Sequence, residues 1–198
     1  MFDYIGEKIR VKLAAIEWIS RTGGYTVQAE TKDGTTKAGY PSAPWYTGAD
    51  CTPTERLNMA PHDGETAIAF VDSDGNLTTV KRTAKYIDFA ANVRVVLWYD
   101  TRRIVYEGDS DREWQMIKDV IGAAKSAEMN TEGLGLARLR FASVQYDPAQ
   151  IWNKYAMRTV GQGLFTWPYK TLAITFTLTG RLVMNCFAGT LTPQASPC

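Results

Sequence analysis

The chain has 198 residues, of which 45% are apolar and 22% are charged, so it can bury a core of its own without disulfides or a metal. Its 22 basic and 21 acidic side chains leave a formal net charge of +1. This balance argues against a dedicated nucleic-acid-binding protein, which normally carries a basic face, and against electrostatic docking to an anionic membrane.

The cysteine content and the N-terminal segment indicate where the protein is made. Cys51, Cys186 and Cys198 are odd in number and have no metal-ligand spacing, so we expect reduced thiols in a cytoplasmic product. The N-terminal segment carries charges throughout its apolar pattern, and no run reaches the roughly 18 apolar residues that a membrane span needs. We therefore expect no signal peptide and no membrane contact.

The first predicted element is an amphipathic helix over about the first fifteen residues. Phe2, Ile5, Ile9, Leu13 and Ile16 recur at the spacing of three and four residues that places them on one helix face.

Extended chain and then a long loop are predicted next. Asp33-Gly34 suits a tight hairpin turn because both residues tolerate positive φ. From Tyr40 to Asp63 the sequence is rich in Pro, Gly and small polar residues and shows no sustained period. We expect a loop over 40–63, of the kind that is functional or becomes ordered against a partner.

Three further strands and a helix are predicted in the middle of the chain. A hairpin turn at Asp74-Gly75 joins the first two strands, and the third, Val93 to Tyr99, is hydrophobic enough to be a central strand. Ser110 and Glu113 form a capping box at the start of the helix. This helix is expected to end near Ala127, and its predicted buried face consists of Trp114, Ile117, Ile121 and Ala124.

The last third is predicted to contain two strands and a short helix. The run "LARLRFASVQYD" is typical of a strand, and Asp147-Pro148 fits the cap and first position of a short helix. In the final strand, one apolar and one mostly hydroxyl-bearing set alternate: Leu172, Ile174, Phe176 and Leu178 against Ala173, Thr175, Thr177 and Thr179.

These elements predict an α+β fold: an antiparallel or mixed β-sheet with an N-terminal helix and a central helix packed on one face, plus the long Pro/Gly-rich loop. We expect a single domain over 1–189 and a flexible C-terminal tail over 190–198.

Residues that could carry chemistry are few. His62 is the only histidine and lies in the loop as "APHDG", without a nucleophile elbow or a cysteine-centred signature. The run "DSDGN" resembles the start of a calcium loop, but Leu77 and Thr83 stand where an EF-hand needs glycine and glutamate. We therefore read that run as a hairpin turn capped by acidic side chains.

The remaining motifs are also better explained by structure. "GLGLAR" precedes a strand and lacks the lysine of a phosphate-binding loop. Arg138 and Arg140 alternate as on the solvated face of an ordinary strand, and Asp109 and Asp111 suit a helix start. We expect no catalytic residue, no cofactor and no metal site.

Exposed aromatic residues and the hydroxyl row favour an assembly subunit. Aromatic residues on loops are the types that anchor protein–protein interfaces, and a threonine row can contact a neighbouring chain. The candidate interface residues are Tyr40, Trp45 and Tyr46 in the long loop, Phe165, Trp167 and Tyr169 before the last strand, and Thr175 and Thr177 within it.

The layout resembles the tail-terminator proteins of long-tailed bacteriophages. The matching pieces are "MFDYIGEKIRVKLAAIEWIS", the segment around Tyr40-Pro41, "VRVVLWYD" running into "SDREWQMIKDVIGAAK", and "LFTWPYKTLAITFTLTGRL". The resemblance implies a homo-oligomeric ring, a hexamer, that caps the tail tube and joins it to the neck or connector. It also implies a virion protein assembled in the bacterial host cytoplasm, through which DNA passes without specific binding.

Three alternatives stay open at this point. The chain could be another neck, tube-initiator or tail-completion protein of the same machine. It could be a host-encoded cytosolic binding module that holds a ligand with the 40–63 loop. It could also be an enzyme with an unfamiliar site around His62 and the acidic loops.

Overall fold

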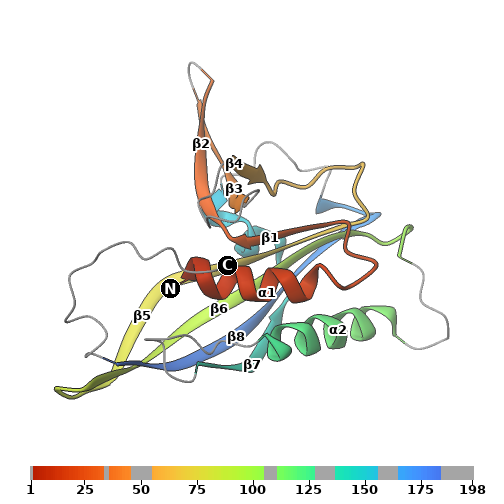
Figure 1. The fold of residues 1–198 in the computed structure, drawn as a ribbon. Coiled ribbons are helices and arrows are strands. Elements are labelled where there is room, and N and C mark those ends of the chain that lie inside the picture. Colours follow the sequence, from red (N-terminus) through yellow and green to blue (C-terminus); the bar gives the residue numbers. More distant parts are fainter. Residues whose placement is uncertain are drawn as a thin grey trace.

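The computed structural model describes residues 2–33, 36–45, 55–104, 111–127, 137–155 and 165–183. In these ranges the chain has an α+β fold, in which two helices lie along the same side of a five-stranded mixed sheet (Figure 1). The expected fold class, with its N-terminal and central helices, is confirmed. All three cysteines and the expected tail over 190–198 lie outside the described residues.

The main sheet has the strand order β1-β5-β6-β8-β7. β1 pairs with β5 in parallel, and the other neighbours are antiparallel. β6 is the middle strand, which confirms the central strand expected at Val93–Tyr99. The strands are β1 (Arg21–Tyr25), β5 (Ala67–Arg82), β6 (Tyr86–Asp100), β7 (Arg138–Gln145) and β8 (Tyr169–Val183).

One face of this sheet is covered by α1 (Phe2–Leu13) and α2 (Arg112–Ser126). α1 buries Ile5, Ile9 and Leu13, as its apolar period predicts. We call this side the helix face. The fully buried residues that the sheet contributes to it include Ala69, Val95, Leu97, Leu172, Ile174 and Phe176.

The opposite face is partly covered by a smaller antiparallel sheet and two short helices. The smaller sheet has the order β2-β3-β4, with β2 (Val27–Asp33), β3 (Thr36–Trp45) and β4 (Glu55–Asn58). The short helices are α3 (Pro148–Ile151) and the 3-10 helix η1 (Asn153–Tyr155). This second core is aromatic, since Phe70 meets Trp152 and Tyr155 edge to face at ring distances of 5.6 and 5.9 Å.

The β2–β3 hairpin projects away from the body of the molecule (Figure 1). Its register runs from Val27 opposite Ser42 near the body to Asp33 opposite Thr36 at the tip. This pairing confirms the hairpin expected around Asp33-Gly34. We call residues 27–33 and 36–42 the arm.

The long loop expected over 40–63 is wrong at two places. β3 continues through Trp45, and β4 occupies Glu55–Asn58, with Ser42 opposite Asn58. The continuation of β3 was not predicted because it contains two prolines, which have no backbone N–H to donate to a neighbouring strand and so argue against a strand in the sequence. The Pro41 carbonyl nevertheless accepts a hydrogen bond from Met59 N at 2.8 Å.

The turn expected at Asp74-Gly75 is also wrong. β5 runs through this position to Arg82, and an irregularity in its pairing with β6 between Ser73 and Leu77 absorbs the turn-like residues. The chain reverses after Arg82 instead, where the Thr83 hydroxyl accepts a hydrogen bond from Tyr86 N at 3.1 Å.

The central helix begins one residue later than the capping box predicts. Its N-cap is Asp111, whose carboxylate accepts a hydrogen bond from Trp114 N at 3.4 Å, while Ser110 lies outside the described residues. The helix ends at Ser126 with Ala127 as its C-cap, close to the expected end near Ala127. The buried face of the helix is rotated relative to the prediction, because the predicted residues and the residues that are actually buried both recur at helical spacing. The buried residues are Met116, Ile117, Val120 and Ala124, whereas Ile121 is half-buried and Trp114 is exposed.

The short helix after β7 has the expected start. Asp147 is its N-cap, and its carboxylate accepts a hydrogen bond from Ala149 N at 2.9 Å, with Pro148 in the first turn.

Candidate interaction surfaces

The two faces of β8 differ as its alternating sequence predicts. On the side away from the helices, the environment changes along the strand: Ala173 is buried in the second core, Thr175 and Thr177 are half-buried, and Thr179 is exposed. The helix face is therefore structural, and the hydroxyl-bearing face is the candidate for function. The residues buried on the helix face are Leu172, Ile174, Phe176 and Leu178.

A buried ion cluster marks the boundary of the second core. Asp72 of β5 is fully buried, and Arg94 of β6 lies opposite it and donates from Nη2 to Asp72 Oδ2 at 2.6 Å. Lys154 of η1 contacts the other oxygen of the same carboxylate, and it also donates to the Ser73 carbonyl at 3.1 Å. The cluster therefore ties η1 to the sheet.

The surroundings of Lys154 act on its charge in opposite directions. Burial lowers the pKa of its ammonium group to about 8, because the charged form loses hydration. Contact with the Asp72 carboxylate favours that same charged form. Since the ammonium group has two oxygen partners, we take Lys154 as charged at neutral pH.

Beyond this cluster the face away from the helices is open and polar. The register places Arg140 opposite Thr177, and Arg138 opposite Thr179, on the same side of the sheet. Asn92 and Ala90 of β6 flank the same two threonines. We call this surface the open face; its residues are Thr78, Lys81, Asp88, Ala90, Asn92, Arg138, Arg140, Ser143, Thr175, Thr177, Thr179 and Arg181.

Basic side chains dominate the open face. Arg181 lies over the Tyr86 ring at 3.9 Å and donates from Nε to Asp88 Oδ1 at 2.6 Å. This hydrogen bond from Arg181 lowers the pKa of the Asp88 carboxyl. Arg138 and Arg140 are exposed, and within the described ranges neither has an ion-pair partner. A hollow of about 400 Å³ lies at this end of the sheet and is lined in part by Asp88, Arg138 and Arg181.

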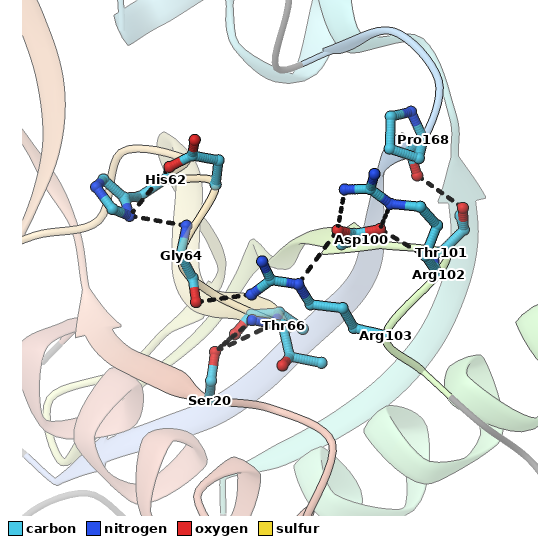
Figure 2. A network of polar contacts seen from close by, with 11 residues as sticks. Ser20, His62, Gly64, Thr66, Asp100, Thr101, Arg102, Arg103 and Pro168 are labelled. Carbon is cyan, nitrogen blue, oxygen red and sulfur yellow. Dashed lines mark hydrogen bonds and ion pairs between the residues drawn. The ribbon is translucent and has the colours of Figure 1, made fainter.

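A second polar cluster lies at the other end of β6. Asp100 is fully buried and accepts hydrogen bonds from Arg102 Nε at 3.0 Å and Nη2 at 2.7 Å (Figure 2). Arg103 approaches the same carboxylate at 3.4 Å and donates to the Gly64 carbonyl at 2.8 Å. The Arg102 guanidinium lowers the pKa of the Asp100 carboxyl. One buried carboxylate thus orients two arginines that reach solvent.

The three aromatic residues expected at an interface before β8 have different environments. Trp167 is 82% exposed, next to the cis bond that it forms with Pro168. Tyr169 is half-buried and stacks on Trp98 at 4.9 Å, and Phe165 is half-buried against Trp152 at 5.3 Å. Trp167 is therefore free to contact a partner, whereas the other two also pack within the chain.

The three aromatic residues expected in the long loop are only partly described. Tyr40 is half-buried and packs against the second core. Trp45 is the last residue of β3 and lies opposite Glu55. Tyr46 lies outside the described residues.

His62 lies in an exposed turn. Its Nδ1 accepts a hydrogen bond from Gly64 N at 3.0 Å and lies 3.7 Å from the Asp63 carboxylate (Figure 2). Across the described part of the chain, no three His, Cys, Asp or Glu side chains are grouped as metal ligands would be. Asp111 serves as a helix cap, and Asp109 lies outside the described residues.

The sequence reading missed both buried carboxylates. Asp72 was predicted to lie in a turn, and Asp100 comes directly after the predicted strand Val93–Tyr99, where no role was predicted for it. The available signal was an acidic residue at the inward-pointing position of a strand, since an aspartate is rarely fully buried unless it is paired.

The helices of the described segments are each too short or too polar to cross a membrane. Comparison of the chain with protein-family models, curated proteins and solved structures gives no match.

Proposed function

We propose that this chain is a tail terminator, a structural protein that forms a ring at the end of the tail tube of a long-tailed bacteriophage and joins it to the neck. The order of elements supports the proposal. The N-terminal helix α1, the β2–β3 hairpin, the central strand β6 leading into α2, and the late alternating strand β8 follow the layout that the resemblance implies.

The projecting arm is the observation that carries the proposal. β2 pairs along its length with β3 alone, and the hairpin extends away from the body of the molecule (Figure 1). An arm of this kind can reach a different surface on an adjacent copy. Repeated contacts between two different surfaces close into a ring when the rotation between copies allows it.

The exposed end of the sheet supports a second contact, with the tube or the neck. Trp167 is exposed, and the carbonyl of the adjacent Pro168 accepts a hydrogen bond from the Thr101 hydroxyl at 2.7 Å. Arg102 and Arg103, which follow Thr101, are held by Asp100 (Figure 2). Tryptophan and arginine are enriched among the residues that dominate binding energies at interfaces. The contacts with Asp100 already restrict the side chains of Arg102 and Arg103 in the free protein. The two arginines therefore lose less conformational entropy on binding than unrestrained side chains would.

The mechanism of such a ring is geometric. Each copy contacts the next through its arm, one side of the ring matches the tube, and the other side differs, so no further tube subunit can add. DNA passes through the centre. No proton transfer or bound ion is needed, and the proposal assigns this chain no reaction.

Shortening the arm tests the proposal. Replacing residues 30–39 with Asn-Gly leaves Ala29 opposite Tyr40, a pairing that a two-residue turn can close. We expect the unaltered protein to form rings, alone or on tubes of the tail-tube protein of the same virus. The shortened protein should fold, as judged by circular dichroism, and form no rings. Native mass spectrometry and negative-stain microscopy measure both.

Two outcomes would contradict the proposal. One is an unaltered protein that remains monomeric both alone and with preformed tubes. The other is a ring that forms but never attaches to a tube end, which would favour another neck or tail-completion protein. Trp167→Ala separates the two contacts, because it should weaken tube attachment without preventing arm-mediated ring formation.

A further inference from the structure

The open face concentrates positive charge that the overall composition conceals. The chain as a whole has a formal net charge of +1. Among the open-face residues whose side chains the structure describes, however, Lys81, Arg138, Arg140 and Arg181 stand against one carboxylate, that of Asp88. Since Asp88 is already bonded to Arg181, the exposed Arg138 and Arg140 are left to attract an anion.

We infer that the open face binds the phosphate backbone of double-stranded DNA. Arg138 and Arg140 point to the same side of β7, about 6.6 Å apart along the strand, as residues two positions apart are in a sheet. The arginine guanidinium can donate two parallel hydrogen bonds to phosphate oxygens, and threonine hydroxyls commonly donate to the DNA backbone. Thr177 and Thr179 lie directly opposite the two arginines and can supply those donors.

The composition of the face favours duplex DNA over single strands. Proteins that bind unpaired nucleic acid present aromatic rings on which bases stack. Tyr86, two residues before Asp88 in β6, has its ring covered by the Arg181 guanidinium at 3.9 Å, and the open-face residues named above include no aromatic side chain. Phe141 of β7 points to the helix face, edge to face with Phe176 at 6.5 Å. Charge and hydroxyls without a free ring suit a backbone contact without sequence preference.

This inference rests on the proposed function for the source of the DNA, which would pass through the ring. It assigns the open face to the channel, and therefore moves Thr175 and Thr177 from contacts between copies to the surface that faces DNA. The contact is electrostatic and sensitive to salt, so it can hold a DNA end and still allow DNA to pass.

Anisotropy of a labelled 30-base-pair duplex, titrated with the full chain over a series of salt concentrations, tests the inference. Arg138→Gln combined with Arg140→Gln should weaken binding and reduce the slope of log affinity against log salt by about 2, one for each lost phosphate contact. Arg112→Gln combined with Lys125→Gln removes the same charge from α2, on the other side of the sheet. This control should bind like the unaltered protein.

Three results would overturn the inference: equal loss in both double variants, tighter binding of a single strand than of the duplex, or equal competition by polyglutamate. The ring test remains separate. Rings without duplex binding overturn this inference alone, and duplex binding by a chain that never forms rings overturns the proposed function alone.

Discussion

Asp72 is the residue on which the joint between η1 and the sheet depends. Its carboxylate is fully buried and contacts both Arg94 and Lys154, so it is the one negative charge shared by two cations. Removing one member of a buried pair leaves the others without compensation, and this costs about 3–5 kcal/mol.

We therefore expect Asp72→Asn to lower the free energy of unfolding by about that amount, measured by urea denaturation. Lys154→Met is the matched comparison, because it removes a poorly hydrated charge and leaves the Asp72–Arg94 pair intact. Its cost should be clearly smaller. Equal costs for the two variants would show that the cluster does not depend on the carboxylate.

Asp100 predicts a pH dependence at the other end of β6. Its pKa is lowered in the folded protein, chiefly by the hydrogen bond from Arg102, from a starting value of 3.8. The unfolded chain therefore takes up its proton at a higher pH than the folded chain does. The stability that Asp100 contributes is present above pH 3.8 and is lost as the pH falls through the lower folded value.

We expect Asp100→Asn to have a lower Tm than the unaltered protein at pH 7, with the difference shrinking as the pH falls towards 2. Thermal melts followed by circular dichroism between these limits measure it. A difference in Tm that stays constant over the whole range would contradict the inference that protonation of Asp100 contributes to the loss of stability at low pH.

Among the elements, α1 approaches its neighbour most closely at a glycine. A Cβ at Gly6 would lie 2.7 Å from the Cβ of Tyr25 in β1 and closer still to the Tyr25 backbone nitrogen. The helix can therefore rest directly on the strand only if this position has no side chain.

We expect Gly6→Ala to destabilise the protein by about 1–3 kcal/mol through overpacking, although alanine favours helices. Gly122→Ala in α2 is the matched control, because no atom lies within 4 Å of its added Cβ. It should stabilise the protein by up to about 1 kcal/mol. Chemical denaturation of both variants checks the opposite signs.

Elements with a regular period could be predicted from the sequence, and elements shaped by distant pairing could not. The apolar residues of α1 and the alternation of β8 are local patterns, and both were predicted correctly. β4 exists because β3 pairs with it, and the proline-containing stretch carries no local sign of that partner. The bulge in β5 is similar, because Asp74-Gly75 favours a turn unless a neighbouring strand holds the chain extended.

At the scale of the whole molecule, the distribution of charge could not be predicted from its total. The near-zero net charge argued against nucleic-acid binding, but the sum does not show which face each residue occupies. Arg138 and Arg181 are far apart in the sequence and share a face because β7 pairs with β8, with Arg138 opposite Thr179. The arm is likewise visible only in three dimensions, since its hairpin was predicted but its projection from the body was not.

The position of β8 has a consequence for biosynthesis. β8 is the last strand along the described chain, yet it lies between β6 and β7 and is the strand with which β7 pairs. The ribosome must therefore finish translating Tyr169–Val183 before β7 can join the sheet and all five strands are in place. Until then β6 exposes a long apolar edge to other nascent chains, so premature termination anywhere upstream yields a product prone to aggregation rather than a smaller folded protein.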